Sequence, residues 1–152
     1  LHSFPTRRSS DLHIVVAIGE ARAIAQRTGE RNSLLMHFGP TNVTAWSLSI
    51  GVELGEGAAV VERAEREPVE LGVFDSANRV AAWHFDLARA FAQEGGSRDL
   101  NAIRHLDTAE RTAPQRLHHD PIARELLFEL DGRARSTVWE LGSLRHRFGV
   151  SA

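Results

Sequence analysis

Hydrophobic residues recur at intervals of three and four positions along most of the chain, and this spacing places them on one face of an α-helix. No segment shows the strict alternation of apolar and polar residues that a half-buried strand requires. Clusters of glycine, proline and polar residues separate the periodic segments and mark turns. The pattern predicts an all-α fold with helices over residues 13–27, 41–54, 57–66, 76–94, 97–113, 121–130 and 137–148.

Capping residues support several of these helix ends. Asp75 or Ser76 can accept a hydrogen bond from the first backbone amides of the helix that follows. Asp120 is followed by proline, a pair typical of a helix start. Thr137 and Glu140 have the spacing of a capping box, so we expect the last helix to begin at Thr137.

Residues 84–114 resemble one tetratricopeptide repeat, which is a pair of antiparallel helices with small and large residues at set positions. The matching positions are Leu87, Ala88, Phe91, Gly95, Ala102, Leu106, Ala109 and Pro114. The glycine-rich turn at 95–97 is longer than in the standard repeat and should bulge, and Pro114 should close the second helix. A looser match covers residues 48–64. The resemblance implies antiparallel helix pairs stacked as a short TPR-like superhelix with a concave groove for peptides or small effectors.

A wider resemblance covers most of residues 13–152. The stretches FGPTNV, LSIGVELGE and DLARAFAQ, together with residues 106–130 and the ending WELGSLRHRFGV, resemble the C-terminal half of bacterial helix-turn-helix regulators of the XRE type. This resemblance implies a non-catalytic sensor and protein-interaction domain in transcription regulation. DNA would be bound only through an N-terminal helix-turn-helix domain that this chain does not contain. The alternative is a free-standing tetratricopeptide scaffold that binds protein partners.

The repeat register predicts which side chains face the concave groove. The first repeat, the looser match, presents its polar side to the groove. The second repeat, within residues 84–114, presents a mixed set of side chains that can hydrogen-bond an extended peptide. The predicted groove residues are Asn42, Ser49, Glu53, Phe85, Arg89 and Gln93. The same residues would also be typical of an ordinary solvated helix face.

The first twelve residues, LHSFPTRRSSDL, do not share the helical pattern. They lack the apolar run of a signal peptide, and two arginines beside an acid make only a weak basic arm. Residues 2–12 resemble the in-frame translation of a sequencing adapter. We therefore expect residues 1–12 to be a non-native, disordered tail and residues 13–152 to be an N-terminally truncated TPR-like domain. The truncation would leave Ile14, Val15 and Ile18 exposed.

Composition and charge narrow the class of protein further. The 152 residues contain no cysteine, so the chain has neither a disulfide framework nor a thiolate metal site. A net charge of -2 creates no field that attracts nucleic acid. Lysine is absent and arginine abundant, which indicates a GC-rich bacterial gene. No apolar run is long enough to span a membrane, so we expect a cytoplasmic protein, with a homodimer left open.

Candidate chemistry is sparse, so we predict no enzyme, no cofactor and no metal. His118 and His119 are adjacent and point in different directions, so they cannot chelate one ion easily; a surface loop is expected instead. The arginines near the C-terminus suit phosphate contact or ion pairing, and the interleaved Glu129, Asp131 and Glu140 favour ion pairing. These arginines are Arg133, Arg135, Arg145 and Arg147.

Aromatic residues inside the helical pattern are expected in the core. This applies to the three tryptophans, Trp46, Trp83 and Trp139. His84 lies beside an apolar stripe, which favours a partly buried or groove-lining histidine over a catalytic base.

Overall fold

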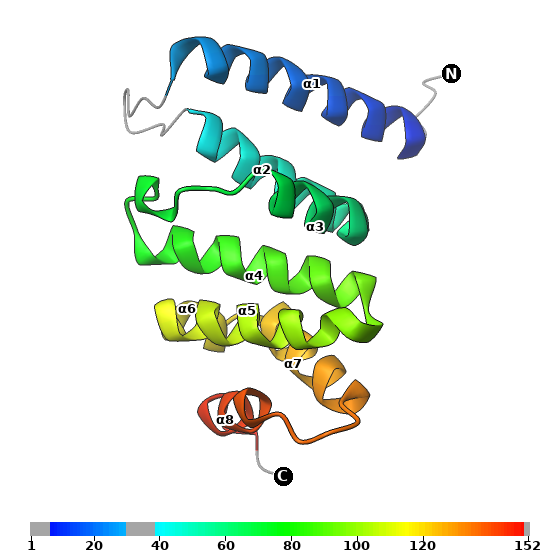
Figure 1. Cartoon of the computed structure of the whole chain (residues 1–152), viewed down its shortest axis with the longest axis vertical. Coiled ribbons are helices and arrows are strands. Elements are labelled where there is room, and N and C mark those ends of the chain that lie inside the picture. Colours follow the sequence, from blue (N-terminus) through cyan, green and yellow to red (C-terminus); the bar gives the residue numbers. More distant parts are fainter. Residues whose placement is uncertain (1–6, 30–38, 151–152) are drawn as a thin grey trace, which may run out of the picture. The chain divides into compact units, whose positions relative to one another are not determined.

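The computed structural model describes residues 7–29 and 39–150, and all regular structure within these ranges is helical (Figure 1). The elements are α1 (Arg7–Thr28), α2 (Pro40–Glu53), α3 (Gly57–Arg66), η2 (Leu71–Val73), α4 (Ala77–Glu94), η3 (Gly96–Arg98), α5 (Asp99–Thr112), α6 (Pro114–His118), α7 (Pro121–Arg133) and α8 (Trp139–Arg147). The predicted all-α class is confirmed. In the described part of the chain, no helix combines the length and the apolar character needed to cross a bilayer.

The chain divides into two compact units, residues 1–50 and 51–152, and the division falls within α2. The first unit holds α1 and most of α2. The second unit holds the end of α2 and all the helices that follow. Each unit is described by itself below.

Helix α1 corrects the expectation for the first twelve residues. It begins at Arg7, so residues 7–12 are helical and not disordered. This segment contains neither glycine nor proline, and each residue added to an existing helix gains a backbone hydrogen bond at little cost. Leu12 is nevertheless 62% exposed and Val15 57%. Residues 1–6 of the expected tail lie outside the described residues.

The second unit is organised around α4 and α5, which are antiparallel and make the most extensive helix contact in it (Figure 1). Ala88, Ala102 and Ala109 are completely buried, because short side chains let two helices approach closely. Leu106 is also completely buried and fills the remaining space. These four repeat-like positions therefore belong to the core.

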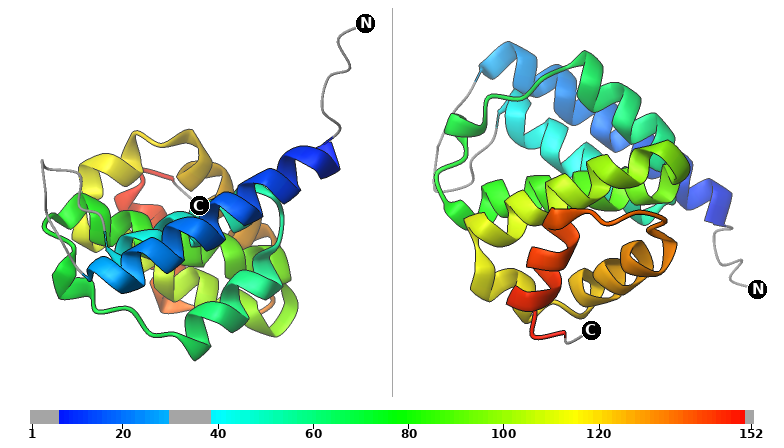
Figure 2. Two further views of the ribbon diagram at one scale, coloured as in Figure 1. Left: turned by 90° about the horizontal axis from the view of Figure 1, so that it is seen from above. Right: turned by 60° about the horizontal axis from the view of Figure 1, so that its bottom comes forward.

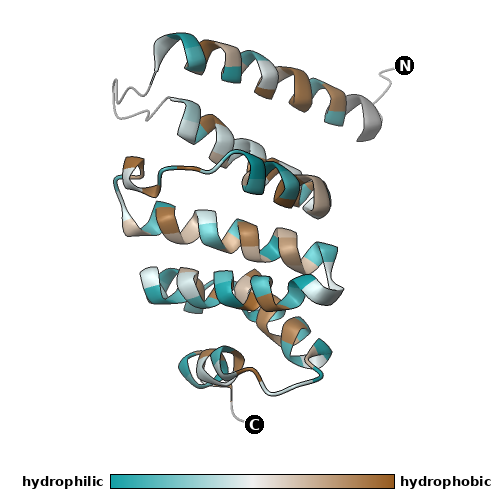
Figure 3. Ribbon diagram, viewed as in Figure 1, coloured by the Kyte–Doolittle hydropathy of each residue, from teal (hydrophilic) through white to brown (hydrophobic). Residues whose placement is uncertain are grey.

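The other helices of this unit pack on either α4 or α5. Helix α3 contacts α4 at Gly57, where a Cβ atom would lie 2.5 Å from the backbone oxygen of Ala90. Helices α6, α7 and α8 all contact α5, and Figure 2 shows them gathered around it. Figure 3 shows hydrophobic residues interspersed with hydrophilic ones along α4 and α5.

The turn between α4 and α5 is longer than in a standard repeat, as the sequence predicts. Gly95 and Gly96 have φ angles of 74° and 60°, a region that favours glycine. The one-turn helix η3 follows before α5 begins at Asp99. Gly149 and Gly55 also adopt positive φ angles, after α8 and α2.

The predicted caps are confirmed at two helices and wrong at a third. The Ser76 hydroxyl accepts a hydrogen bond from the Arg79 amide at 3.3 Å, and the Asp120 carboxylate accepts one from the Ile122 amide at 2.9 Å. Helix α8 begins at Trp139 with Val138 as its cap residue, and no side chain caps it. Thr137 lies one residue too early for its hydroxyl to reach the amides that a capping box requires.

Helix α6 was not predicted. Helix α5 ends at Thr112, as expected for a helix closed by a following proline. Pro114, however, also occupies the first turn of α6, where its missing amide proton costs nothing. Five residues are too few to show a hydrophobic period, and Leu117 is the buried residue of this helix.

The tryptophans divide between the core and the surface. Trp83 is 7% exposed and lies 6.2 Å from Phe74 between ring centroids, so its predicted core position is confirmed. Trp46 and Trp139 are 46% and 66% exposed, and the core prediction is wrong for both. Trp139 is at the first position of α8, and Arg111 of α5 lies over its ring.

Candidate ligand-binding site

The predicted groove residues fall in both units of the chain. Asn42 and Ser49 belong to the first unit, where Asn42 is buried and Ser49 is partly buried. Glu53, Arg89 and Gln93 belong to the second unit, together with Phe85. Within the second unit, Arg89 contacts both Glu53 and Phe85.

The groove residues of the second unit contact one another and their neighbours. The Arg89 guanidinium lies 2.7 Å from the Glu53 carboxylate, and the Gln93 side-chain amide donates to the Val52 carbonyl oxygen at 2.8 Å. Phe85 is buried, with the Arg89 guanidinium 5.9 Å from its ring centroid. Their main interactions are thus made within the fold, and their contact with a ligand stays a prediction.

A small cavity borders two of these residues. Arg89 and Gln93 line a space of about 160 Å³ together with side chains of α7. Ligand pockets for small molecules typically have about 300 to 1,000 Å³. This space is too small for a peptide or a drug-sized effector.

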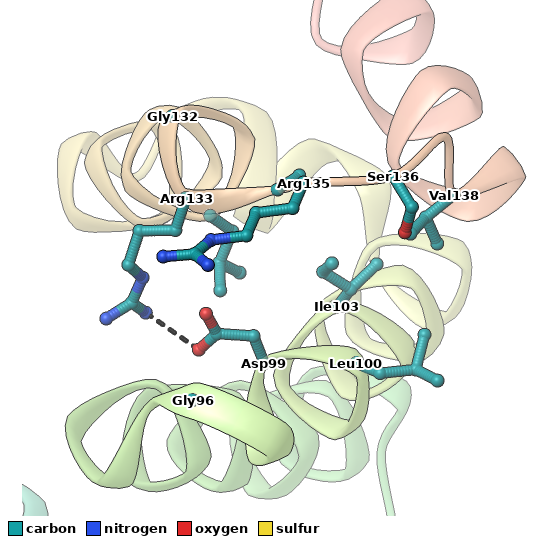
Figure 4. Close-up of a pocket in the computed structure, with 11 residues that line it drawn as sticks. Gly96, Asp99, Leu100, Ile103, Gly132, Arg133, Arg135, Ser136 and Val138 are labelled. Atoms are coloured by element: carbon teal, nitrogen blue, oxygen red, sulfur yellow. Dashed lines mark ion pairs between the residues drawn. The ribbon is translucent and has the colours of Figure 1, made fainter.

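A larger cavity, open to solvent, lies between the start of α5 and the end of α7, and residues of the segment 134–138 line one side of it (Figure 4). Its volume is about 810 Å³, which falls within the range typical of small-molecule sites. Its lining residues are Gly96, Asp99, Leu100, Ile103, Leu130, Gly132, Arg133, Ala134, Arg135, Ser136 and Val138. We refer to this space as the α5–α7 cavity.

The walls of the α5–α7 cavity combine an aliphatic surface with a charged edge. Leucine, isoleucine and valine side chains form the aliphatic surface, from Leu100, Ile103, Leu130 and Val138. The charged edge contains Asp99, Arg133 and Arg135, and Ser136 adds a hydroxyl group. Such a mixture can hold an apolar body and orient a polar group.

Arg133 is held by the fold. Its guanidinium lies 3.1 Å from the Asp99 carboxylate and 3.2 Å from the Glu129 carboxylate. Two of its nitrogens also donate to the Ala92 carbonyl oxygen, both at 3.2 Å. This carbonyl lies in the last turn of α4, where backbone oxygens lack helical partners and attract cations. The positive charge of Arg133 is therefore offset within the protein.

Arg135 is different, because it makes no ion pair or hydrogen bond within the described part of the chain. Figure 4 shows its guanidinium extending over the cavity beside the Asp99–Arg133 pair. Asp131, four positions earlier, would reach Arg135 if the helix continued. The helix ends at Arg133, however, and Asp131 pairs with Arg145 at 3.2 Å instead.

The predicted pairing with the interleaved acids is thus confirmed for Arg133 and Arg145 and wrong for Arg135. Arg147 forms ion pairs too, but with Asp107 and Glu110 of α5. The sequence showed enough acidic residues for pairing, but not which of them each arginine would reach. A cation just beyond a helix end, facing no acid, is the signal that could have separated Arg135 from the others.

A second polar cluster lies where α5, α6 and α8 meet. Glu110 is almost fully buried, and its carboxylate accepts hydrogen bonds from Arg147 at 2.6 Å and from His118 at 3.0 Å. The Arg147 guanidinium also contacts Asp107 at 2.5 Å and the Ser143 hydroxyl. Burial alone would lower the pKa of Arg147, but the bonds to Asp107 and Glu110 raise it above its ordinary value.

The predicted surface loop is wrong for His118, which is helical, whereas His119 lies in an exposed turn as expected. His118 is the last residue of α6 and reaches the buried Glu110, while His119 contacts the Gln115 carbonyl oxygen at 2.7 Å. Asp120 caps α7. Among the residues that the structure describes, no three His, Asp or Glu side chains are grouped so as to hold a metal ion.

His84 is partly buried, as predicted, and it pairs with a histidine of the neighbouring helix. Its Nδ1 atom lies 3.0 Å from Nδ1 of His105, so one ring donates a hydrogen and the other accepts it. The His105 ring also stacks on Phe91. Burial lowers the pKa of His84, while burial and the neighbouring His84 lower the pKa of His105 to about 4. This neutral pair links α4 to α5.

Comparison of the chain with protein-family models, with curated proteins and with solved structures finds no match.

Proposed function

We propose that this protein is a non-catalytic sensor and protein-interaction domain of a bacterial transcriptional regulator, which binds a peptide or small effector. The observation that carries the proposal is the α5–α7 cavity. It has the volume of a ligand site, an aliphatic surface and one arginine whose charge the fold does not offset. DNA would be bound by a helix-turn-helix domain elsewhere in the parent protein.

The packing of α4 against α5 supports a repeat-like architecture for this domain. Ala88, Ala102, Leu106 and Ala109 occupy the small and large positions of the repeat, and all four are completely buried. We propose that this pair is one unit of a short TPR-like superhelix. Solenoids of this kind present surfaces for partner binding.

The side chains of the α5–α7 cavity favour binding over catalysis. The titratable residues that line it are Asp99, Arg133 and Arg135, with no histidine, cysteine or lysine. Arginine stays protonated and cannot serve as a general base, and Asp99 is already paired with Arg133. Ser136 has no base beside it among the lining residues to activate its hydroxyl group. We therefore propose no cofactor and no reaction.

The reading frame upstream of codon 13 in the genomic DNA tests the regulator proposal. An in-frame helix-turn-helix sequence is expected, and a start codon close upstream would overturn it. In a gel-shift assay, the purified parent protein should also bind DNA from the region upstream of its own gene. A parent protein with the predicted domain but no DNA binding would count equally against the proposal.

A free-standing scaffold that binds protein partners is the second candidate function, and an exposed tryptophan beside an arginine favours it. Trp139 is 66% exposed, and the Arg111 guanidinium lies 6.0 Å from its ring centroid. Tryptophan and arginine are the residue types most enriched at the energetic centres of protein interfaces. A start codon just upstream of codon 13 would favour this candidate.

A further inference from the structure

We propose that the α5–α7 cavity binds a carboxylate carried on an aliphatic body, with Arg135 as the partner of the carboxylate. This inference rests on the proposed effector-binding role and specifies the class of effector. Two sources share this chemistry: a free medium-chain fatty acid, and the C-terminal aliphatic residue of a peptide.

The charges at the cavity favour a ligand with a single negative charge. Arg133 and Asp99 offset each other at 3.1 Å, which leaves the charge of Arg135 without a partner. A guanidinium binds a carboxylate through two parallel hydrogen bonds. A doubly charged phosphate would find one unpaired guanidinium among the residues that line the cavity, so its second charge would have no partner there. One carboxylate therefore matches the site better than a phosphate.

Two polar atoms at the charged edge are buried without a hydrogen-bond partner among the described residues. They are the donor Arg133 Nε and the acceptor Asp99 Oδ1. Buried donors of this kind are uncommon in folded proteins, because an unpaired donor loses the hydrogen bonds of water. The described residues therefore do not fully satisfy the charged edge, and the exposed Arg135 supplies the guanidinium that a carboxylate in the cavity can reach.

The apolar residues of the cavity favour a ligand with an aliphatic part. Leu100, Ile103 and Val138 line the cavity beside the charged edge, and Leu100 is 38% exposed. Covering exposed apolar surface with an aliphatic chain is favourable in proportion to the area removed from water. The volume of about 810 Å³ leaves room for a ligand of several carbon atoms beyond its carboxylate.

Titrations of the full 152-residue chain by NMR test the proposal. The acid probes are octanoate and the peptide acetyl-Ala-Ala-Leu with a free C-terminus, and the neutral probes are octanamide and the amide of the same peptide. At least one acid should shift the resonances of Leu100, Ile103 and Val138 saturably, with a dissociation constant of roughly millimolar order for so small a ligand. Its neutral counterpart should bind at least about tenfold more weakly, because it loses the charge-assisted bonds.

Two single variants test whether Arg135 binds the carboxylate of the ligand. Arg135→Ala should weaken binding of the acid about tenfold or more. Arg116→Ala is the matched control, because Arg116 is an exposed arginine of α6 that does not line the cavity, and this variant should bind like the unchanged chain. Binding of octanoate alone would identify a fatty acid, and binding of the acid peptide alone would identify a peptide C-terminus.

Three results would overturn the inference. These are no saturable shift at the cavity with either acid, equal affinity for acids and amides, or an Arg135→Ala variant that binds as tightly as Arg116→Ala. Inorganic phosphate that binds at the cavity more tightly than octanoate would overturn it as well. Each of these outcomes leaves the regulator proposal standing, because the upstream reading frame and the gel shift test that proposal independently.

Discussion

Arg147 and Arg135 carry the same charge within the same C-terminal region, yet their surroundings are opposite. Arg147 contacts Asp107, Glu110 and Ser143, and it joins α8 to α5. Arg135 lies on the segment between α7 and α8 and has no partner in the described part of the chain. Sequence spacing alone does not separate them, since acidic residues surround both.

The difference lies in what each arginine's hydrogen-bonding groups are used for. Glu110 is buried, so its charge is tolerated because Arg147 pairs with it and His118 forms a hydrogen bond with it. Arg147 therefore stabilises the fold. The bonding groups of Arg135 are free beside a cavity, so its removal should affect a bound ligand more than the folded state.

The largest expected effect follows removal of the Arg147 side chain. Arg147→Ala leaves the buried Glu110 with His118 as its remaining partner and should lower the free energy of unfolding by about 3 kcal/mol. Urea denaturation followed by circular dichroism measures this. Adding Glu110→Leu should restore much of the loss, because the uncompensated charge is then removed. A loss below about 1 kcal/mol for the single variant would contradict a structural role for Arg147.

Acid should destabilise the protein through the His84–His105 contact. Unlike Arg147, these histidines have no carboxylate partner in the described part of the chain that would stabilise their charged form. The pKa of His105 is about 4 in the folded protein, below its ordinary value of 6.5, so protons bind the unfolded chain more tightly. Stability from this group is complete above pH 6.5 and is lost as the pH falls toward 4. Between pH 7 and pH 5 we expect a loss of about 1–2 kcal/mol.

The variant His105→Gln isolates this contribution from that of the carboxyl groups. Urea midpoints measured at pH 7 and pH 5 should differ less for the variant than for the unchanged chain. Equal pH dependence in both proteins would show that His105 does not titrate in this way.

Replacing Arg133 should destabilise the fold less than replacing Arg147 and more than replacing Arg135. Arg133→Ala removes the ion pair with Asp99 and the two donors to the Ala92 carbonyl oxygen, but its side chain is 34% exposed. We expect a loss of about 1 kcal/mol in the free energy of unfolding. A shift as large as that of Arg147→Ala would place Arg133 with the buried cluster instead.

The smallest effect on stability is expected at Arg135. Arg135→Ala should change the free energy of unfolding by less than about 0.5 kcal/mol, because this side chain forms no ion pair or hydrogen bond with the described residues. Thermal unfolding at neutral pH measures this directly. A destabilisation of 1 kcal/mol or more would mean that Arg135 has a structural partner, and the contrast with Arg147 would disappear.

Local sequence signals predicted most helices because they act over a few residues. Ser76 and Asp120 cap helices through their own side chains, and Gly95 supports a turn through its own backbone freedom. Thr137 also has the right local spacing, yet α8 begins two residues later, at Trp139. A cap motif states which residues can begin a helix, while packing of the helix decides whether they do.

The candidate site was harder to predict because it depends on contacts between distant segments. Arg89 and Gln93 were predicted for a ligand groove, but they contact Glu53 and the Val52 carbonyl, about 40 positions earlier. Arg135 was placed among ion-paired residues, and only the end of α7 separates it from Asp131. Glu110 and Arg147, similarly, meet only because α8 returns to α5.

The sequence by itself determined the helical class, most helix boundaries and the small residues at the contact of α4 with α5. These features depend on periodicity, capping and backbone freedom, which are properties of neighbouring residues. The tertiary structure alone decided which arginines are neutralised and where a cavity forms. The physical reason is that ion pairing and cavity shape depend on distances between helices that are far apart in the sequence, and no local pattern encodes those distances.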